Sequence, residues 1–180
     1  MITVIASTNR KESGARQFAT HYYELLRQLT DEPVQLLALE EIAHDWFHPD
    51  MYDPDKQAPS LRRLQETYIL PADKFVFVIP EYNGGFPGVL KLFLDAVSVY
   101  RYRDNFHGKK AALVGIATGR AGNLRGMEHL TGILNHLGVI VLPNKLPISS
   151  IERLMDEEGR ITDPATRQAI EQQARAFLDF

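Results

Sequence analysis

Short runs of apolar residues alternate along this chain with longer segments in which apolar residues recur every three or four positions. The runs are rich in β-branched side chains and end in polar or glycine-rich stretches, as buried strands do. The segments between them have the spacing of amphipathic helices. The pattern predicts strands over 2–7, 33–39, 74–80, 110–118 and 139–144, and helices over 14–29, 61–70, 87–100, 123–138 and 165–180.

Residues typical of helix starts stand where the pattern changes. Ser13 occupies an N-cap position before the first predicted helix, because its side chain can accept a bond from a free backbone N–H. Pro87 stands at the first position of a helix, where its missing N–H costs nothing. Thr162 or Asp163, followed by Pro164, begins the last helix.

Regular alternation of strand and helix predicts a parallel sheet covered by helices on both faces. The run 74–80 is apolar at nearly every position, as expected of a central strand buried on both sides. Five strands and five helices in 180 residues fit a flavodoxin-like three-layer αβα sandwich with strand order 2-1-3-4-5. No interior linker or repeat divides the chain, so we expect one domain over 1–180.

In such sheets a ligand binds at the carboxyl ends of the strands, near the point where the strand order reverses. The loops after strands 1, 3 and 4 are therefore the places to look for unusual chemistry. After strand 1 the hydroxyl and basic side chains of Ser7, Thr8, Arg10 and Ser13 lead into a helix start, which favours anions. The alternative is that Ser13 is only a cap and Arg10 only a solvated charge.

The loop after strand 3 reads "PEYNGGF", residues 80–86. Tyr82 can stack on a ring, Asn83 offers a donor and an acceptor on one amide, and Gly84-Gly85 let the backbone approach a flat ligand closely. The alternative is a plain strand-to-helix turn with glycines at positive φ. That turn leaves the presence of Tyr82 and Asn83 unexplained.

The loop after strand 4, "TGRAGNLRG" at 118–126, is again rich in glycine. Gly119, Gly122 and Gly126 do not have the spacing of a dinucleotide fingerprint, and the loop lacks the lysine and hydroxyl residue of a P-loop. A plain turn is an equal alternative for this loop alone. Three such loops at one edge favour a mononucleotide with its phosphate on loop 1 and its planar end against the other two.

Composition narrows the function classes. Apolar residues make up 44% and charged residues 24% of the chain, as in globular proteins, and the net charge of −3 argues against nucleic acid as a partner. The absence of cysteine excludes thiol catalysis and cysteine-ligated metals. His44 and His48 have a metal-binding spacing only on a helix, which Pro49 opposes, so we expect no metal site.

The chain opens directly on a strand pattern, and its apolar runs are short. We therefore expect neither a targeting segment nor a membrane span, and a cytoplasmic protein.

The motifs "STNRKES" at 7–13 and "PEYNGGFPGVLKLFLD" at 80–95, followed by a glycine-rich loop, resemble the NAD(P)H-dependent FMN reductase family. The resemblance covers roughly residues 2–145. It implies a flavodoxin-like flavoprotein related to quinone, azo-dye and chromate reductases. The implied cofactor is FMN, with NADPH or NADH as electron donor.

The resemblance also implies a site. Ser7, Thr8, Arg10 and Ser13 would hold the FMN phosphate; Pro80, Glu81, Tyr82, Asn83, Gly84 and Gly85 would line the isoalloxazine; and Thr118, Gly119, Arg120 and Gly122 would meet the pyrimidine side or the ribityl chain. Hydride would pass from the nicotinamide to N5 of FMN and then to a small acceptor, such as a quinone, free flavin, azo compound or metal oxyanion, in a ping-pong scheme. No catalytic side chain is required.

Family members that resemble this chain are homodimers or homotetramers with helix 87–99 at the interface. The mixture of aromatic residues and arginines at 100–110 fits an interface, with an ordinary connecting loop as the alternative. In the proline-rich segment 44–60, which the pattern predicts to be a surface loop, Trp46 and Phe47 would cover the cleft or, as we favour, pack on a partner subunit.

Two other functions remain open. A flavodoxin-type electron carrier without nicotinamide oxidase activity would be more acidic and would have a threonine-rich phosphate loop, whereas here Arg10 stands in that loop. An interaction module that has lost the flavin would bind no FMN.

Overall fold

A computed structural model describes all of residues 1–180 and shows a parallel sheet between two layers of helices. The sheet order is β2-β1-β3-β4-β5, and a sixth strand also pairs with β4. This is the predicted 2-1-3-4-5 order with one strand added. The strands are β1 (Ile2–Ala6), β2 (Val34–Ala38), β3 (Lys74–Pro80), β4 (Lys110–Ile116), β5 (Ile140–Val141) and β6 (Leu146–Ile148).

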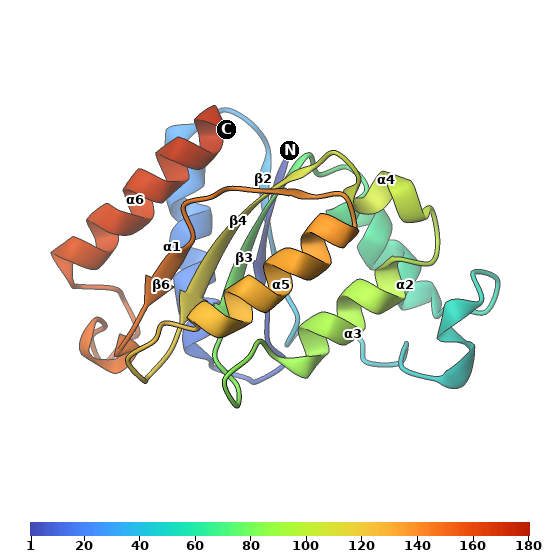
Figure 1. The fold of residues 1–180 in the computed structure, drawn as a ribbon, viewed down its shortest axis with the longest axis horizontal. Helices are drawn as coiled ribbons and strands as arrows, with labels where there is room; N and C mark the ends of the chain where they lie inside the picture. The colour runs from blue at the N-terminus through green and yellow to red at the C-terminus, as the bar shows by residue number, and fades with distance from the viewer.

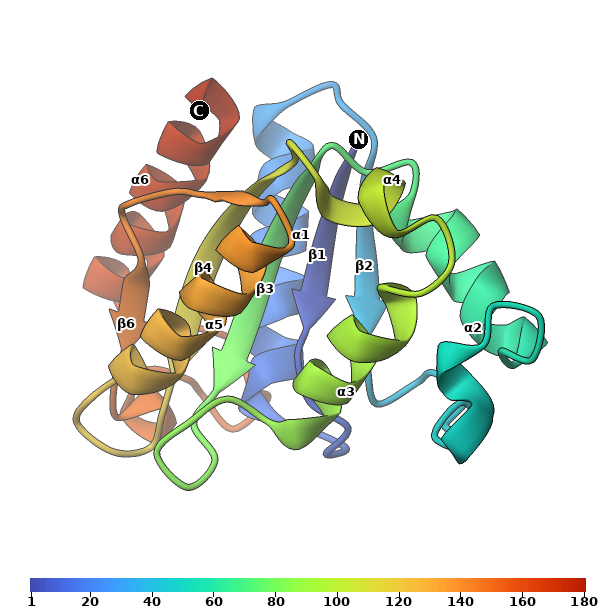
Figure 2. The same cartoon turned by 45° about the vertical axis from the view of Figure 1, so that its right-hand side comes forward.

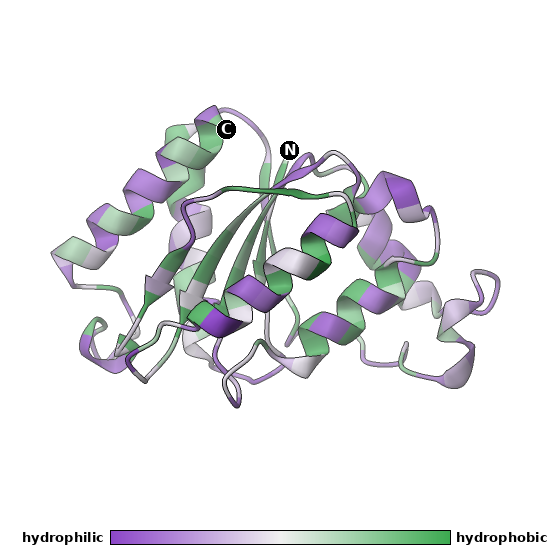
Figure 3. Cartoon of the chain, viewed as in Figure 1, coloured by the Kyte–Doolittle hydropathy of each residue, from purple (hydrophilic) through white to green (hydrophobic).

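Helices cover both faces of the sheet (Figures 1 and 2). They are α1 (Gly14–Leu29), α2 (Pro59–Leu64), α3 (Gly88–Val97), α4 (Tyr102–Phe106), α5 (Leu124–His136) and α6 (Pro164–Asp179), with the short turns η1 (Pro49–Tyr52), η2 (Gln65–Ile69) and η3 (Ile151–Arg153). One apolar core lies beneath α1 and α6, and a second lies beneath α2, α3 and α5. In Figure 3 hydrophilic and hydrophobic residues alternate along the helices, which is the pattern of amphipathic helices packed on a core.

The strand predicted over 139–144 is split in the structure. β5 pairs with the start of β4 and β6 with its end, while 142–145 leave the ladder. Pro143 lacks the N–H that a continuous strand would donate. The side chain of Gln173 on α6 fills the gap by donating to the carbonyls of Leu113 and Asn144, at 3.0 and 2.8 Å.

Several predicted boundaries also shift. The helix predicted over 61–70 is α2 followed by the π-helical turn η2, and the helix predicted over 87–100 is α3 with Pro87 as its N-cap. The caps at Ser13 and Asp163 are confirmed, since each side chain accepts the backbone N–H three residues later.

The segment 100–110, for which the sequence left an interface and an ordinary connecting loop as alternatives, contains the short helix α4. Asn105 on α4 is fully buried, and its amide donates to the carbonyls of Val97, Tyr100 and Arg101. This bonding satisfies the end of α3, because the last carbonyls of a helix have no partner within it.

Both interpretations of Trp46 are wrong. Its side chain is 2% exposed within this chain's own core, and its ring N–H donates to the carbonyl of Ala43. Phe47, by contrast, is 72% exposed. The segment 44–60 is therefore anchored by Trp46 and Met51 and contains η1 and the start of α2.

Candidate functional site

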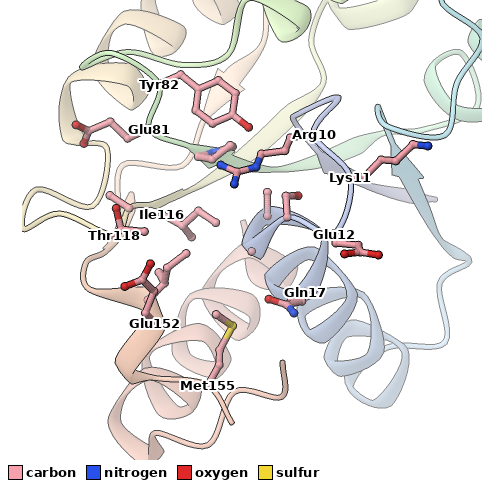
Figure 4. Close-up of a pocket in the computed structure, with 16 residues that line it drawn as sticks. Arg10, Lys11, Glu12, Gln17, Glu81, Tyr82, Ile116, Thr118, Glu152 and Met155 are labelled. Atoms are coloured by element: carbon pink, nitrogen blue, oxygen red, sulfur yellow. The ribbon is translucent and has the colours of Figure 1, made fainter. Parts of the chain in front are cut away.

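Four loops meet at the carboxyl edge of the sheet and enclose a cavity of about 470 Å³ (Figure 4). They follow β1, β3, β4 and β6. The lining residues are Arg10, Lys11, Glu12, Ser13, Gly14, Ala15, Gln17, Pro80, Glu81, Tyr82, Ile116, Ala117, Thr118, Ile151, Glu152 and Met155. The cavity thus lies where a doubly wound sheet binds its ligand.

The start of α1 forms one wall of this cavity. Ser13 caps the helix by accepting the N–H of Arg16 at 3.3 Å. The N–H groups of Gly14 and Ala15 have no protein partner, as the first N–H groups of a helix do not. Because these groups and the helix dipole face the cavity beside Arg10, this wall favours an anion.

Ser7 and Thr8 lie beneath the cavity and do not line it. Ser7 is fully buried, and its hydroxyl donates to the carbonyl of Ile5 at 3.3 Å. Thr8 is 1% exposed, and its hydroxyl oxygen accepts the N–H of Arg10 at 3.1 Å. The same hydroxyl is hydrogen-bonded to the phenol of Tyr82 at 2.7 Å. Of the predicted phosphate-loop residues, the structure places Arg10 and Ser13 on the cavity surface.

The "YNGG" stretch forms a tight hairpin turn. Tyr82 and Gly85 exchange backbone hydrogen bonds of 2.9 and 3.0 Å. Asn83 and Gly84 both have positive φ, 52° and 76°, as a type I′ turn requires. Gly85 does not have a positive φ, although the turn predicted from the sequence placed both glycines at positive φ. Pro80, Glu81 and Tyr82 therefore line the cavity, while Asn83, Gly84 and Gly85 form the tip of the turn outside it.

Thr118 is the predicted residue of the β4 loop that lines the cavity; Gly119, Arg120 and Gly122 do not. A Cβ on Gly122 would lie 2.6 Å from the backbone nitrogen of Ile148, so this glycine allows the loop to pass close to β6. Asn123 holds the loop to β3, because its amide donates to the carbonyls of Ile79 and Pro80 at 3.1 and 3.0 Å.

Sequence reasoning missed the wall formed by the segment after β6. Ile151, Glu152 and Met155 line the cavity from η3 and the residues that follow it. These residues follow the carboxyl end of β6, so the rule that ligands bind at the carboxyl ends of the strands applies to them. The sequence pattern does not reveal β6, because it predicts a single strand that ends at 144. The other lining residues missed were Lys11, Glu12, Gly14, Ala15, Gln17, Ile116 and Ala117.

Backbone strain gathers at the same edge. Five residues other than glycine have positive φ, and four of them, Glu12, Asn83, Asn123 and Ser150, lie in these four loops. Such conformations cost free energy and cluster at ligand sites, where the surrounding structure holds them in place. This clustering independently supports a ligand site here.

The residues present fit FMN. A volume of about 470 Å³ lies within the range of cofactor pockets. Unpartnered N–H groups of α1 and the Arg10 guanidinium suit a phosphate at one end, and Pro80, Tyr82 and Ile116 offer apolar surface to a planar ring.

The strand order, the helix layers and the cavity together define a flavodoxin-like α/β protein with a cavity at the carboxyl edge of its sheet. The sequence model of the family described as NADPH-dependent FMN reductase matches residues 1–152. The chain belongs to this family, whose members are oxidoreductases that depend on FMN and NAD(P)H. The fold, the family and the class of cofactor predicted from the sequence are confirmed.

Two named relatives support the assignment to this family. The chain is 37% identical over 132 residues to the NAD(P)H-dependent FMN reductase of Pseudomonas aeruginosa, covering 71% of this chain and 70% of that protein. It is 31% identical over 128 residues to 2-hydroxy-1,4-benzoquinone reductase of a Burkholderia species, covering 71% and 68%.

Among solved structures, the flavoenzyme NAD(P)H:(acceptor) oxidoreductase FerB from Paracoccus denitrificans superposes with a TM-score of 0.78. The match covers 99% of this chain and 94% of that one at 23% identity, and it supports the fold. No helix of this chain has both the length and the apolar character needed to cross a bilayer.

Proposed function

We propose that this chain binds FMN in the cavity at the carboxyl edge and passes hydride from NADPH or NADH to a small acceptor in a ping-pong reaction. One observation carries the proposal: a helix N-terminus with unpartnered N–H groups, the Arg10 guanidinium and the ring of Tyr82 converge on one cavity. The acceptor would be a quinone, free flavin, azo compound or metal oxyanion; free flavin and quinone match the names of two relatives, and the other two follow from the family resemblance.

Arg10, Ser13 and the N–H groups of Gly14 and Ala15 would hold the phosphate, since they are the donors on the cavity wall at α1. Pro80, Glu81, Tyr82 and Thr118 would line the ring. The remaining residues of the predicted set, Ser7, Thr8, Asn83, Gly84, Gly85, Gly119, Arg120 and Gly122, lie off the cavity surface.

Bound FMN would supply the hydride chemistry at its N5 atom. The chain's own task is to orient the ring and to exclude water from one of its faces. Backbone hydrogen bonds fix the walls for this purpose: the N–H of Glu81 donates to the carbonyl of Ile116 at 2.9 Å, which holds the ends of β3 and β4 together. We assign no catalytic side chain.

We propose that the whole chain acts as one cytoplasmic FMN-binding domain that assembles as a homodimer or homotetramer. The supporting feature is a surface groove of about 570 Å³ between α3 and α5, with Tyr52 and Tyr102 exposed beside it. Exposed aromatic side chains on such a surface favour protein contact. Sedimentation equilibrium tests this: a monomer at micromolar concentration contradicts it.

Steady-state kinetics with FMN-loaded protein test the reaction. Both nicotinamides are varied against a panel of quinones, azo dyes, chromate and free FMN. The proposal predicts turnover with at least one pair and parallel double-reciprocal lines, the pattern of a ping-pong scheme. FMN binding without oxidation of either nicotinamide would instead indicate an electron carrier, and no FMN binding would indicate an interaction module.

A further inference from the structure

The hydroxyls of Thr8 and Tyr82 join the loop after β1 to the loop after β3. Their oxygens lie 2.7 Å apart although the residues are 74 positions apart in the chain. Thr8 is 1% exposed, whereas Tyr82 is partly exposed and lines the cavity. Figure 4 shows the Tyr82 ring at the cavity wall, on the side where Arg10 lies. The hydrogen bond therefore connects a buried group to one that faces the site.

The burial of Thr8 favours one direction of this bond, which the positions of the two oxygens alone do not fix. A threonine hydroxyl has one proton to donate and two lone pairs to accept with. One lone pair of Thr8 accepts the N–H of Arg10, and the phenol oxygen of Tyr82 is the acceptor within its reach. If Tyr82 donated instead, the buried Thr8 proton would have no partner, which is costly.

The arrangement that satisfies every group is the one in which Thr8 donates to Tyr82, and it leaves the phenol proton of Tyr82 available on the cavity side. A phenol whose oxygen accepts a hydrogen bond is also a stronger donor, because bonds in a chain polarise one another. The bond thus fixes the position of the ring and leaves one donor facing the cavity.

We propose that Thr8 is a positioning residue: it holds the Tyr82 ring as the wall for the bound flavin and presents the phenol proton to the cavity, without contacting the phosphate. This inference rests on the proposed function. It replaces the sequence-based prediction that Thr8 binds the FMN phosphate, because Thr8 is 1% exposed and does not line the cavity.

Affinities for FMN and for riboflavin separate the two roles, since riboflavin lacks only the phosphate. Dissociation constants are measured by quenching of flavin fluorescence for wild type, Thr8→Val, Thr8→Ser, Tyr82→Phe, Thr8→Val/Tyr82→Phe and Arg10→Ala. Thr3→Val is the matched control: Thr3 is equally buried on β1, and its hydroxyl donates to the carbonyl of Tyr68, away from the site.

We expect Thr8→Val and Tyr82→Phe each to weaken both flavins by the same factor, about threefold to tenfold for one lost hydrogen bond. The effects of the two changes should be less than additive in the double variant, because both remove the hydrogen bond between the two hydroxyls. Thr8→Ser should restore wild-type affinity, and Thr3→Val should leave both affinities unchanged. Arg10→Ala should weaken FMN about tenfold, as expected for a charge-assisted bond, and leave riboflavin unchanged.

Two results would overturn the inference. The first is a Thr8→Val variant that loses preference for FMN over riboflavin as Arg10→Ala does, because Thr8 would then contact the phosphate. The second is additive effects of Thr8→Val and Tyr82→Phe, because the two hydroxyls would then act separately. A wild-type protein that binds neither flavin defeats the proposed function itself, which the wild-type titration shows before any variant is compared.

Discussion

Tyr22 is the most deeply buried ionisable side chain on α1, and its hydroxyl has no hydrogen-bond partner. Its ring packs against the sheet beside Phe18 and Leu26. Burial raises the pKa of the Tyr22 phenol above its ordinary value, because ionisation within the core loses the solvation of water. The ring of Tyr22 fills the core, whereas its hydroxyl makes no hydrogen bond. Removing the hydroxyl alone therefore tests how this part of the core is packed.

Tyr22→Phe should increase the free energy of unfolding by about 1 kcal/mol, because it removes an unsatisfied buried hydroxyl and keeps the ring. A raised folded-state pKa gives stability that is complete below the unfolded pKa of about 10 and is lost above it. Wild type should therefore lose more stability than Tyr22→Phe as the pH rises past 10. Urea unfolding at pH 7 to 11 measures both effects, and a variant less stable than wild type at pH 7 would show that the hydroxyl has a partner.

Two glycines of one loop should behave differently when a methyl group is added. Gly122 has a φ of 53° and lies against β6, so Gly122→Ala should destabilise the fold by about 2 kcal/mol or more. Gly119 has open space around it, so Gly119→Ala should leave stability unchanged within about 0.5 kcal/mol. Thermal unfolding of both variants measures this, and equal effects would contradict the packing described for Gly122.

At the scale of elements, strands β1 to β4 and the long helices follow directly from hydrophobic periodicity. The central strands are apolar on both faces, and the caps at Ser13 and Asp163 are encoded within three residues of where they act. The edge strand was misread because its interruption depends on Gln173, which lies about 30 residues further along the chain. Local patterns carry no information about such a distant partner.

Gln173→Leu should destabilise the protein by about 2–3 kcal/mol, because the buried carbonyl of Leu113 loses this donor and the partly buried bond to Asn144 is also lost. Gln172→Leu is the matched control, since Gln172 lies exposed on the same helix. Chemical denaturation of both variants tests this expectation. A Gln173→Leu variant as stable as the control would mean that the gap between β5 and β6 closes without the side chain.

At the scale of the whole molecule, the location of the site was predictable because it follows from the strand order alone. Its surface was not. Ser7 and Thr8 follow the end of β1, which lies between β2 and β3, and both are buried instead of lining the cavity as the sequence pattern predicts. The wall formed by Glu152 and Met155 depends on the position of β6, which the sequence pattern did not reveal.

Charged side chains from three of the four loops, those after β1, β3 and β6, line the cavity. Glu12, Glu81 and Glu152 line it together with Arg10 and Lys11, so three carboxylates oppose two cations. Glu152→Gln should therefore strengthen FMN binding about twofold to fivefold at low salt, by removing a charge that repels the phosphate through solvent. Glu157→Gln, exposed and outside the cavity, is the control. Titrations of FMN and riboflavin at two salt concentrations test this; an equal gain for riboflavin would contradict an electrostatic cause.

The proposed reaction requires that FMN is bound where a nicotinamide can reduce it. Anaerobic titration of the FMN-loaded protein with NADPH, and separately with NADH, measures this directly through the visible absorbance of the flavin. We predict complete bleaching of bound FMN by one equivalent of at least one nicotinamide, followed by return of the absorbance when a quinone is added. FMN that stays bound and oxidised in the presence of both nicotinamides would contradict the account.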